Sequence, residues 1–173
     1  MENQNLVKSL GLKYGGFYAM LYILILVIEE SFSLESQVVL SIGGIILSFL
    51  IIWQATNEFK SLGDGTLDLS SALKIGLAIV AIGGIGYAVF LYVNYNFINP
   101  DFIETLREQE LLKLQTARDA GQIKTDEEAE VAEKAVVMFT SPFVLATIAL
   151  LGQLFKAFIF GLIIGLINRG KKS

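Results

Sequence analysis

The sequence predicts an all-α polytopic membrane protein, in which four transmembrane helices form two hairpins and a further helical hairpin lies between the third and fourth. Two observations indicate this class. Of the 173 residues, 54% are hydrophobic, and the apolar residues gather in four blocks. A hydrocarbon core of about 30 Å needs roughly 20 apolar residues per helix, and each block approaches that length. A chain of this size is normally one domain, so we predict a single membrane domain over residues 1–173.

The predicted spans cover about residues 12–28, 38–55, 72–93 and 143–167. The first is short enough for a signal peptide, but Glu29-Glu30-Ser31-Phe32 after it is a poor cleavage site, so we expect a retained span. Leu62-Gly63-Asp64-Gly65 indicates a turn after the second span. We expect Ser70 or Ser71 to cap the third.

The insertion over residues 94–141 contains signals for two helices. Asn99-Pro100-Asp101 has the pattern of an N-cap followed by Pro at the first helical position, and Gly121 is expected to end that helix. Thr125-Asp126-Glu127-Glu128 matches a capping box and begins the next helix. Ser141-Pro142 then opens the fourth span. The result is a helical hairpin outside the membrane, with ten acidic against five basic residues.

A weak internal repeat favours two hairpins of the same orientation. Leu12-Lys13-Tyr14-Gly15 opens the first span and Leu73-Lys74-Ile75-Gly76 opens the third. Short matches of this kind also arise by chance in apolar sequence, but parallel repeats are known in transporters.

The distribution of basic residues predicts the orientation, because Lys and Arg near span ends accumulate on the cytoplasmic side. Such residues lie before or at the start of the first span, before or at the start of the third, and after the fourth: Lys8, Lys13, Lys60, Lys74, Arg169, Lys171 and Lys172. The first–second loop, over residues 29–37, has none. We therefore expect a multi-pass membrane protein with both termini cytoplasmic and the insertion extracytoplasmic.

Small residues form stripes that allow helices to approach closely. Ala157, Gly161 and Gly165 recur every fourth residue in the last span, and Gly11 and Gly15 do so in the first; Gly44 and Gly84 supply small residues to the other two. These residues are candidates for packing within one four-helix bundle. The alternative is that one stripe is a homodimer or partner face.

Lys156 is the one charged residue inside the last apolar block. An ionisable residue in a span is expensive, which makes it a candidate functional site. It lies roughly 17 Å from Ile167 and 21 Å from Pro142 along the helix, farther than a lysine can snorkel. We expect Gln153, Tyr22 and Tyr87 at the same depth to complete a polar site. The alternatives are a lysine that reaches internal water or a thinned bilayer, or one that contacts a partner protein.

The chain lacks the residues on which many catalytic and metal sites depend. It has no Cys and no His, which excludes thiol nucleophiles, Cys/His zinc sites and imidazole bases. The acidic run over residues 126–130 lacks the spacing and glycine of a calcium loop, and the glycine pairs do not form a phosphate loop. Nothing forms a basic nucleic-acid patch. We predict no catalytic residues, no cofactor, no metal and no nucleic-acid partner.

The chain resembles a bacterial membrane family catalogued as domain of unknown function 4199. The motifs that carry the resemblance are Lys13-Tyr14-Gly15, Glu58-Phe59-Lys60, Gly65 with Ala72-Leu73-Lys74-Ile75-Gly76, Asn99-Pro100, and the closing segment over residues 161–172. It covers nearly the whole chain. The resemblance implies a four-helix inner-membrane protein with an extracytoplasmic insertion and without an established activity, and it carries no catalytic residues.

Two functions compete on these observations. The first is a non-enzymatic membrane protein that acts through contacts with membrane lipid, another membrane protein or a second copy of itself. The second is a small carrier or binding protein for a polar solute or lipid, with its mid-membrane site around Lys156. An enzyme is not expected, since no nucleophile–base pair is in place.

The predicted topology can be tested by cysteine labelling, because the chain has no native Cys. In intact cells, an impermeant maleimide should label Gln122→Cys in the insertion and leave Lys8→Cys unlabelled until the cells are lysed. The opposite pattern would overturn the orientation.

Overall fold

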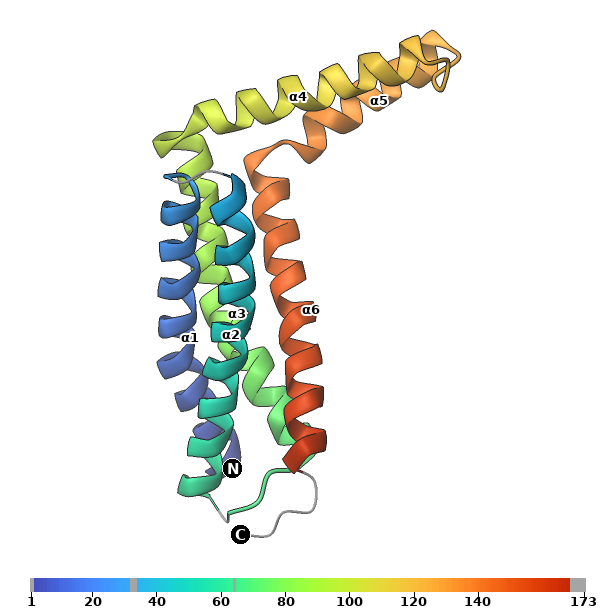
Figure 1. Cartoon of the computed structure of the whole chain (residues 1–173). Coiled ribbons are helices and arrows are strands. Elements are labelled where there is room, and N and C mark those ends of the chain that lie inside the picture. Colours follow the sequence, from blue (N-terminus) through green and yellow to red (C-terminus); the bar gives the residue numbers. More distant parts are fainter. Residues whose placement is uncertain (1, 32–33, 64, 169–173) are drawn as a thin grey trace. The chain divides into compact units, whose positions relative to one another are not determined.

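The computed structural model describes residues 2–31, 34–63 and 65–168, and within these ranges all regular structure is helical. The elements are α1 (Glu2–Glu29), α2 (Leu34–Leu62), α3 (Leu69–Val93), the π-helical η1 (Asn94–Ile98), α4 (Pro100–Asp119), α5 (Asp126–Phe139) and α6 (Pro142–Asn168), as Figure 1 shows. The prediction of an all-α chain is confirmed.

Within the described residues, four helical segments are long and apolar enough to cross a membrane: Gln4–Glu29, Val38–Leu62, Leu69–Ile98 and Pro142–Asn168. The four predicted blocks fall on these helices, but every helix is longer than its block. A helix satisfies its backbone hydrogen bonds internally, so it continues past the hydrocarbon boundary into segments with polar side chains. Hydropathy blocks therefore underestimate helix length.

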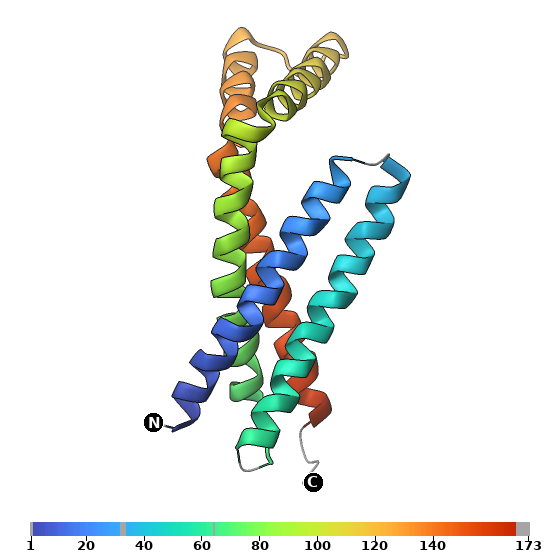
Figure 2. The ribbon, with the colours of Figure 1, turned by 90° about the vertical axis from the view of Figure 1, so that its left-hand side faces the viewer.

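The chain forms two compact units, Met1–Tyr87 with Leu150–Ser173, and Ala88–Ala149. In the first unit, α1 and α2 run antiparallel beside the first part of α3 and the last part of α6 (Figures 1 and 2). The beginnings of α1 and α3 lie at the same end of this unit as the ends of α2 and α6 (Figure 1).

The core of the first unit contains residues from all four of these helices. Its largest fully buried side chains include Tyr18, Leu10, Ile52, Ile75 and Ile164. Many other large apolar side chains of the same helices are exposed, as on α2, where Val39 is 69% accessible and Ile46 55%. In a soluble protein this exposure would be costly, and on a membrane span it is the surface that faces lipid.

Glycine contacts join the helices of the first unit. A Cβ atom placed on Gly83 of α3 would lie 2.4 Å from the Gly15 carbonyl oxygen of α1, so the two backbones touch. Gly11 and Gly15 face α3 as well, because a Cβ atom on either would lie 3.0 Å from the Cβ atom of Ala78 or Ile82, respectively.

The small residues of α6 and the remaining candidates also lie at helix contacts. Gly161 faces the backbone of Leu73 on α3 and Gly165 faces Leu69, while the Ala157 carbonyl lies against Gly76. Gly44 of α2 faces Ile25 of α1, and Gly84 faces Leu150 of α6. All seven predicted packing residues thus lie at contacts between helices of one chain, and Gly76 and Gly83 join them.

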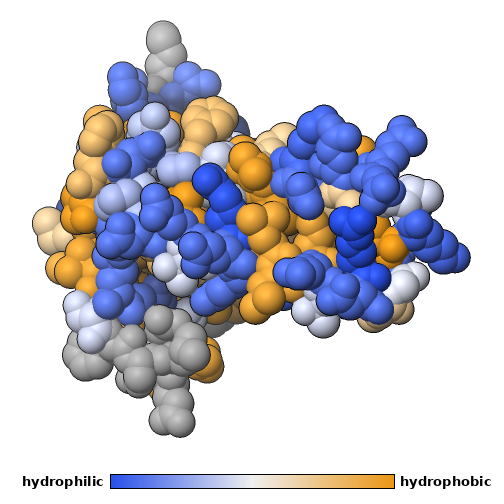
Figure 3. All heavy atoms as spheres, turned by 90° about the horizontal axis from the view of Figure 1, so that it is seen from above, coloured by the Kyte–Doolittle hydropathy of each residue, from blue (hydrophilic) through white to orange (hydrophobic). Residues whose placement is uncertain are grey.

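The second unit contains the hairpin of α4 and α5. The predicted capping box is present: the Thr125 hydroxyl accepts from the Glu128 amide at 3.2 Å, and the Glu128 carboxylate accepts from the Thr125 amide at 3.2 Å. Gly121, expected to end α4, has φ +71°. Figure 3, which looks down on the hairpin, shows hydrophilic side chains with hydrophobic ones between them.

The other predicted caps differ in outcome. α6 begins at Pro142 after Ser141, whose hydroxyl accepts from the Val144 amide at 3.4 Å. α4 begins at Pro100, but the Asn99 side chain makes no capping bond, because its backbone (φ −133°, ψ 62°) lies outside the extended conformation that aims a capping oxygen at the helix.

The prediction that Ser70 or Ser71 caps α3 is wrong. The helix begins at Leu69, two or three residues earlier than either serine predicts, and Asp68 accepts from the Ser71 amide at 3.1 Å. The hydrogen bond from the Ser71 side chain, helped by backbone amides and the charge of Lys74, holds the pKa of the Asp68 carboxyl below its ordinary value.

We expect Thr125→Ala to loosen the first turns of α5. Loss of an N-cap side chain typically costs about 0.5–2 kcal/mol, so amide hydrogen exchange should rise over residues 126–134. Thr116→Ala is the matched control, because the Thr116 hydroxyl bonds back to the Leu112 carbonyl within the same helix. Equal exchange in both variants would contradict a stabilising role for the capping box.

We expect Gly83→Ala to destabilise the first unit, because the new methyl group would meet the backbone of α1. Overpacking of this kind costs about 1–3 kcal/mol. Gly16→Ala is the matched control, since a Cβ atom there meets nothing within 4 Å. Alanine has a higher helix propensity than glycine, by up to about 1 kcal/mol, so this variant should not be destabilised. Unfolding in mixed detergent micelles, followed by circular dichroism, measures both, and equal stabilities would refute the contact.

Candidate functional site

Polar side chains from several helices meet inside the first unit at the level of Lys156. Gln153 and Lys156 are three residues apart on α6, Tyr18 and Tyr22 are four apart on α1, and Tyr87 lies on α3. Residues spaced by three or four lie on the same face of a helix. The structure therefore brings together the four residues predicted from the sequence, and it adds Tyr18.

The Lys156 amine lies against Tyr22. It donates a hydrogen bond to the Tyr22 hydroxyl, and its Nζ lies 4.5 Å from the centre of the Tyr22 ring. The Tyr22 hydroxyl in turn lies 3.4 Å from both the Gly44 carbonyl oxygen and the Ser48 Oγ on α2. Gly44 therefore has two roles. Because it has no side chain, α1 can pack closely against α2 at this position, and its carbonyl oxygen accepts a hydrogen bond from Tyr22.

Tyr18 and Gln153 form a second, more deeply buried pair. The Tyr18 hydroxyl donates to the Gln153 Oε1, and both side chains are buried. The ring centre of Tyr22 lies 4.8 Å from that of Tyr18 and 5.5 Å from that of Tyr87. Three tyrosines therefore form a continuous aromatic row beside the two polar residues of α6. Tyr18 was missed in the sequence, although its position four residues before Tyr22 is the signal that identifies it.

The partners that the structure gives to the Lys156 amine are neutral. Lys156 takes no part in the ion pairs Lys13–Glu58, Lys113–Glu110, Arg118–Asp126 and Lys134–Glu130. The side chain is half-buried, so it is not fully enclosed by the unit. A tyrosine hydroxyl and ring stabilise an ammonium group but do not neutralise it. The arrangement can therefore bind an acidic group that comes from outside the chain.

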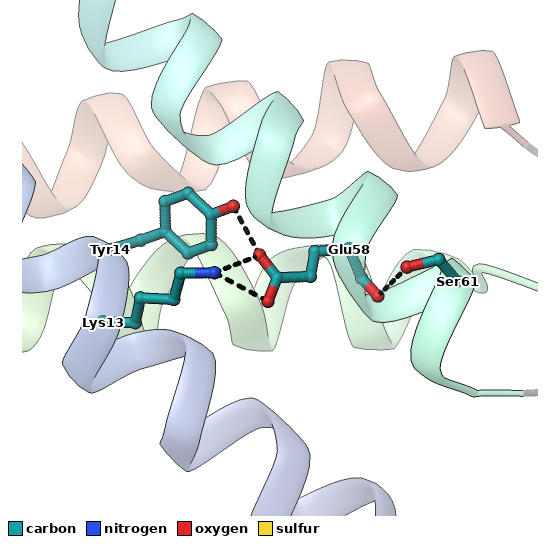
Figure 4. Close-up of polar contacts among 4 residues, drawn as sticks. All are labelled: Lys13, Tyr14, Glu58 and Ser61. Atoms are coloured by element: carbon teal, nitrogen blue, oxygen red, sulfur yellow. Dashed lines mark hydrogen bonds and ion pairs between the residues drawn. The ribbon is translucent and has the colours of Figure 1, made fainter.

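A second polar cluster lies on α1 and α2, toward the end where α1 begins. Lys13 Nζ lies 2.8 and 2.7 Å from the two Glu58 carboxylate oxygens, and the Tyr14 hydroxyl donates to Glu58 Oε2 at 2.6 Å (Figure 4). The Ser61 hydroxyl donates to the Glu58 backbone carbonyl at 2.8 Å. The Lys13 side chain is 51% exposed and that of Glu58 27%, so solvent or lipid headgroups reach this ion pair from one side only.

The same two segments carry part of the family resemblance. Lys13-Tyr14 and Glu58 belong to separate motifs of that resemblance, and the structure joins them in one contact. Exposed ion pairs contribute at most about 1 kcal/mol, but the buried Tyr14 ring positions its hydroxyl on the same carboxylate. The cluster thus fixes the register of α1 against α2. Sequence spacing alone does not reveal this contact, because 45 residues separate Lys13 and Glu58.

The hairpin of the second unit holds a cleft of about 560 Å³ between α4 and α5. Apolar and charged side chains line it together: Leu111, Leu114, Gln115, Arg118, Asp119, Ile123, Ala129 and Glu133. Arg118 is engaged by Asp126 at 2.6 Å. Among the described residues, no group of three or more Asp, Glu, His or Cys side chains is placed to hold a metal ion.

The four apolar helices define a multi-pass membrane protein. Residues 10–169 match the family described as "Protein of unknown function (DUF4199)", and the chain belongs to this family. The match covers nearly the whole chain and confirms the resemblance found in the sequence. No curated protein and no solved structure matches the chain.

Proposed function

We propose that this protein is a non-enzymatic protein of the bacterial inner membrane that acts by binding another membrane component, a protein or a lipid, through Lys156. The observation that carries the proposal is a half-buried lysine amine, deep within a membrane span, whose partner in the chain is a neutral tyrosine.

The depth of Lys156 determines how much free energy its burial in the span costs. The residue lies about 18 Å from the Asn168 end of α6 and about 21 Å from the Pro142 end. Translocon measurements put a lysine at the centre of a span at roughly 2.5–3.5 kcal/mol. A cation–π contact returns about 0.5–2 kcal/mol. The rest of the cost favours an acidic partner at the same depth, such as a carboxylate of a neighbouring span.

The composition of the polar cluster supports binding over catalysis. Its members are a lysine, a glutamine and tyrosines held by hydrogen bonds and ring contacts. A nucleophile needs an adjacent base. The nearby Ser48 hydroxyl donates to the Ile45 carbonyl at 2.9 Å and meets the cluster only through the Tyr22 hydroxyl at 3.4 Å, so it is not paired directly with the Lys156 amine. Binding requires only that the amine be presented at the surface of the unit, and its half-buried side chain meets that requirement.

For the orientation, we propose cytoplasmic termini and an extracytoplasmic α4–α5 hairpin. Lys8, Lys13, Lys60 and Lys74 belong to the segments that lie at one end of the first unit, where α1 and α3 begin (Figure 1). Lysines near span ends favour the cytoplasmic side. Three further basic residues that favour the same orientation, Arg169, Lys171 and Lys172, lie outside the described residues.

The second candidate function is a small carrier or binding protein for a polar solute. It is favoured by the continuity of hydrogen-bonding groups from Gln153 and Tyr18 through Tyr22 to Ser48. A polar solute within the span would need such a row, because unsatisfied polar groups are costly in hydrocarbon. The two functions share Lys156 and differ in what binds to it.

We expect Lys156→Met to abolish association with the bound component while the protein remains folded. Removing the desolvated amine should also raise the melting temperature in mild detergent, by about 2–4 °C for each kcal/mol gained. Affinity purification in mild detergent, with mass spectrometry of co-purifying proteins and lipids, measures the association. Lys8→Met is the matched control, since Lys8 is exposed near the start of α1.

The proteins and lipids that co-purify with each variant decide between the two functions. A protein or lipid that is retained by the parent and by Lys8→Met, but lost from Lys156→Met, supports the proposal. If Lys156→Met retains the same companions, the lysine is only tolerated in the span, whether or not the melting temperature rises, and the proposed function is wrong. A solute of low molecular mass lost in the same comparison would favour the carrier instead.

A further inference from the structure

Exposed apolar side chains gather at the base of the α4–α5 hairpin, the end at which it joins the two neighbouring spans. Phe97 is 76% exposed, Ile98 62%, Met138 53% and Phe139 53%, and Phe102 and Val137 are exposed as well. We name these six residues the basal cluster. They come from two stretches of chain, one formed by the end of η1 and the first turn of α4, and the other by the last turn of α5.

The basal cluster is held in place by contacts within the second unit. The Tyr95 ring stacks on Phe102, with centres 4.7 Å apart and planes 9° apart, which joins η1 to the first turn of α4. Arg107 of α4 donates to the Thr140 hydroxyl at 3.3 Å, just beyond the end of α5. Each half of the cluster is thus held by a contact of a neighbouring residue, while its apolar side chains remain exposed.

The cluster continues the lipid-facing surface of the spans. Phe97 and Ile98 are themselves the last residues of the candidate span Leu69–Ile98, in which Tyr92 and Val93 are also exposed. On the other side, the exposed Phe143 is the second residue of the candidate span Pro142–Asn168. The span Leu69–Ile98 has 30 residues, or about 45 Å of helix. A bilayer is about 30 Å thick in its hydrocarbon and about 40–45 Å with both interfacial layers. A span of this length ends in the interfacial layer, and the basal cluster lies at that end.

The outer surface of the hairpin becomes polar beyond the base. On α5, the exposed residues before the last turn are mostly charged, among them Glu127, Glu130 and Lys134. Away from the base, the exposed large apolar residues of α4 and α5 are Leu112 and Val131, which lie on different helices. Scattered apolar residues are normal on a soluble surface, whereas a contiguous group indicates a contact surface. The contact surface is confined to the base.

We propose that the basal cluster is embedded in the interfacial layer of the lipid bilayer, so that the hairpin is anchored to the membrane at its base and extends into water at its tip. Aromatic residues are favoured at this depth, where apolar and polar surroundings meet. The occupant of the surface is lipid, because the cluster is continuous with residues that lipid already covers. The proposal holds for either orientation of the chain and does not depend on the role of Lys156.

The test is site-directed spin labelling in nanodiscs of phosphatidylcholine. Phe97→Cys and Phe139→Cys report on the two halves of the cluster, and Gln122→Cys reports on the tip. Leu112→Cys is the matched control, because Leu112 is also apolar and 65% exposed but lies ten residues beyond Phe102. Circular dichroism and gel filtration establish that each labelled variant is folded.

We expect labels at residues 97 and 139 to show several-fold higher relaxation by oxygen, which concentrates in lipid, than by a water-soluble nickel chelate. Labels at residues 112 and 122 should show the reverse. If all four labels are equally accessible to the chelate, the base lies in water and the proposal fails. Low accessibility to both reagents at residues 97 and 139, with dipolar broadening between copies, would show that a second copy covers the cluster, and this would also overturn it.

Discussion

The close approach of α1 and α3 is the contact on which the first unit depends. Gly15 and Gly83 bring the two backbones together, and a Cβ atom on Gly83 would also lie 3.0 Å from the Tyr18 Cβ. Tyr18 can therefore enter the interior only because position 83 has no side chain. Between membrane helices there is no hydrophobic driving force, so this kind of van der Waals contact carries the association. The tyrosines that reach Gln153 and Lys156 follow from it.

The two lysine sites of the first unit show how the same side chain is used at different depths. Lys13 lies toward the end of a span, is half exposed, and pairs with the Glu58 carboxylate. Lys156 lies deep in its span and meets the hydroxyl and ring of Tyr22. The charge of Lys13 is paired within the chain, and the ion pair links α1 to α2. Lys156 has a tyrosine and not a carboxylate as its partner within the chain, which is why we propose it as the binding residue.

In the second unit, local sequence signals set the ends of the helices. Its helices begin and end where short-range signals say they should, at Thr125 with Glu128, at Gly121 and at Ser141-Pro142, because capping depends on neighbouring residues and not on the rest of the fold. The basal cluster depends on tertiary structure. Phe102 and Phe139 are 37 positions apart in the chain, and only the folded hairpin brings their segments to one end.

The sequence by itself determined the class of this protein, because membrane spans are set by length and hydropathy, and both are local. It also determined the depth of Lys156, since helical rise converts residue number into distance. Where it misjudged a local feature, as at the start of α3, Asp68 competed with two serines that have the same capping chemistry. Tertiary structure decided which residues share a site. Tyr18 joins Gln153 across 135 positions, and Tyr14 joins Glu58 across 44. Contacts of this range depend on how helices rotate and cross, which follows from packing at single glycines and is not encoded in any local pattern.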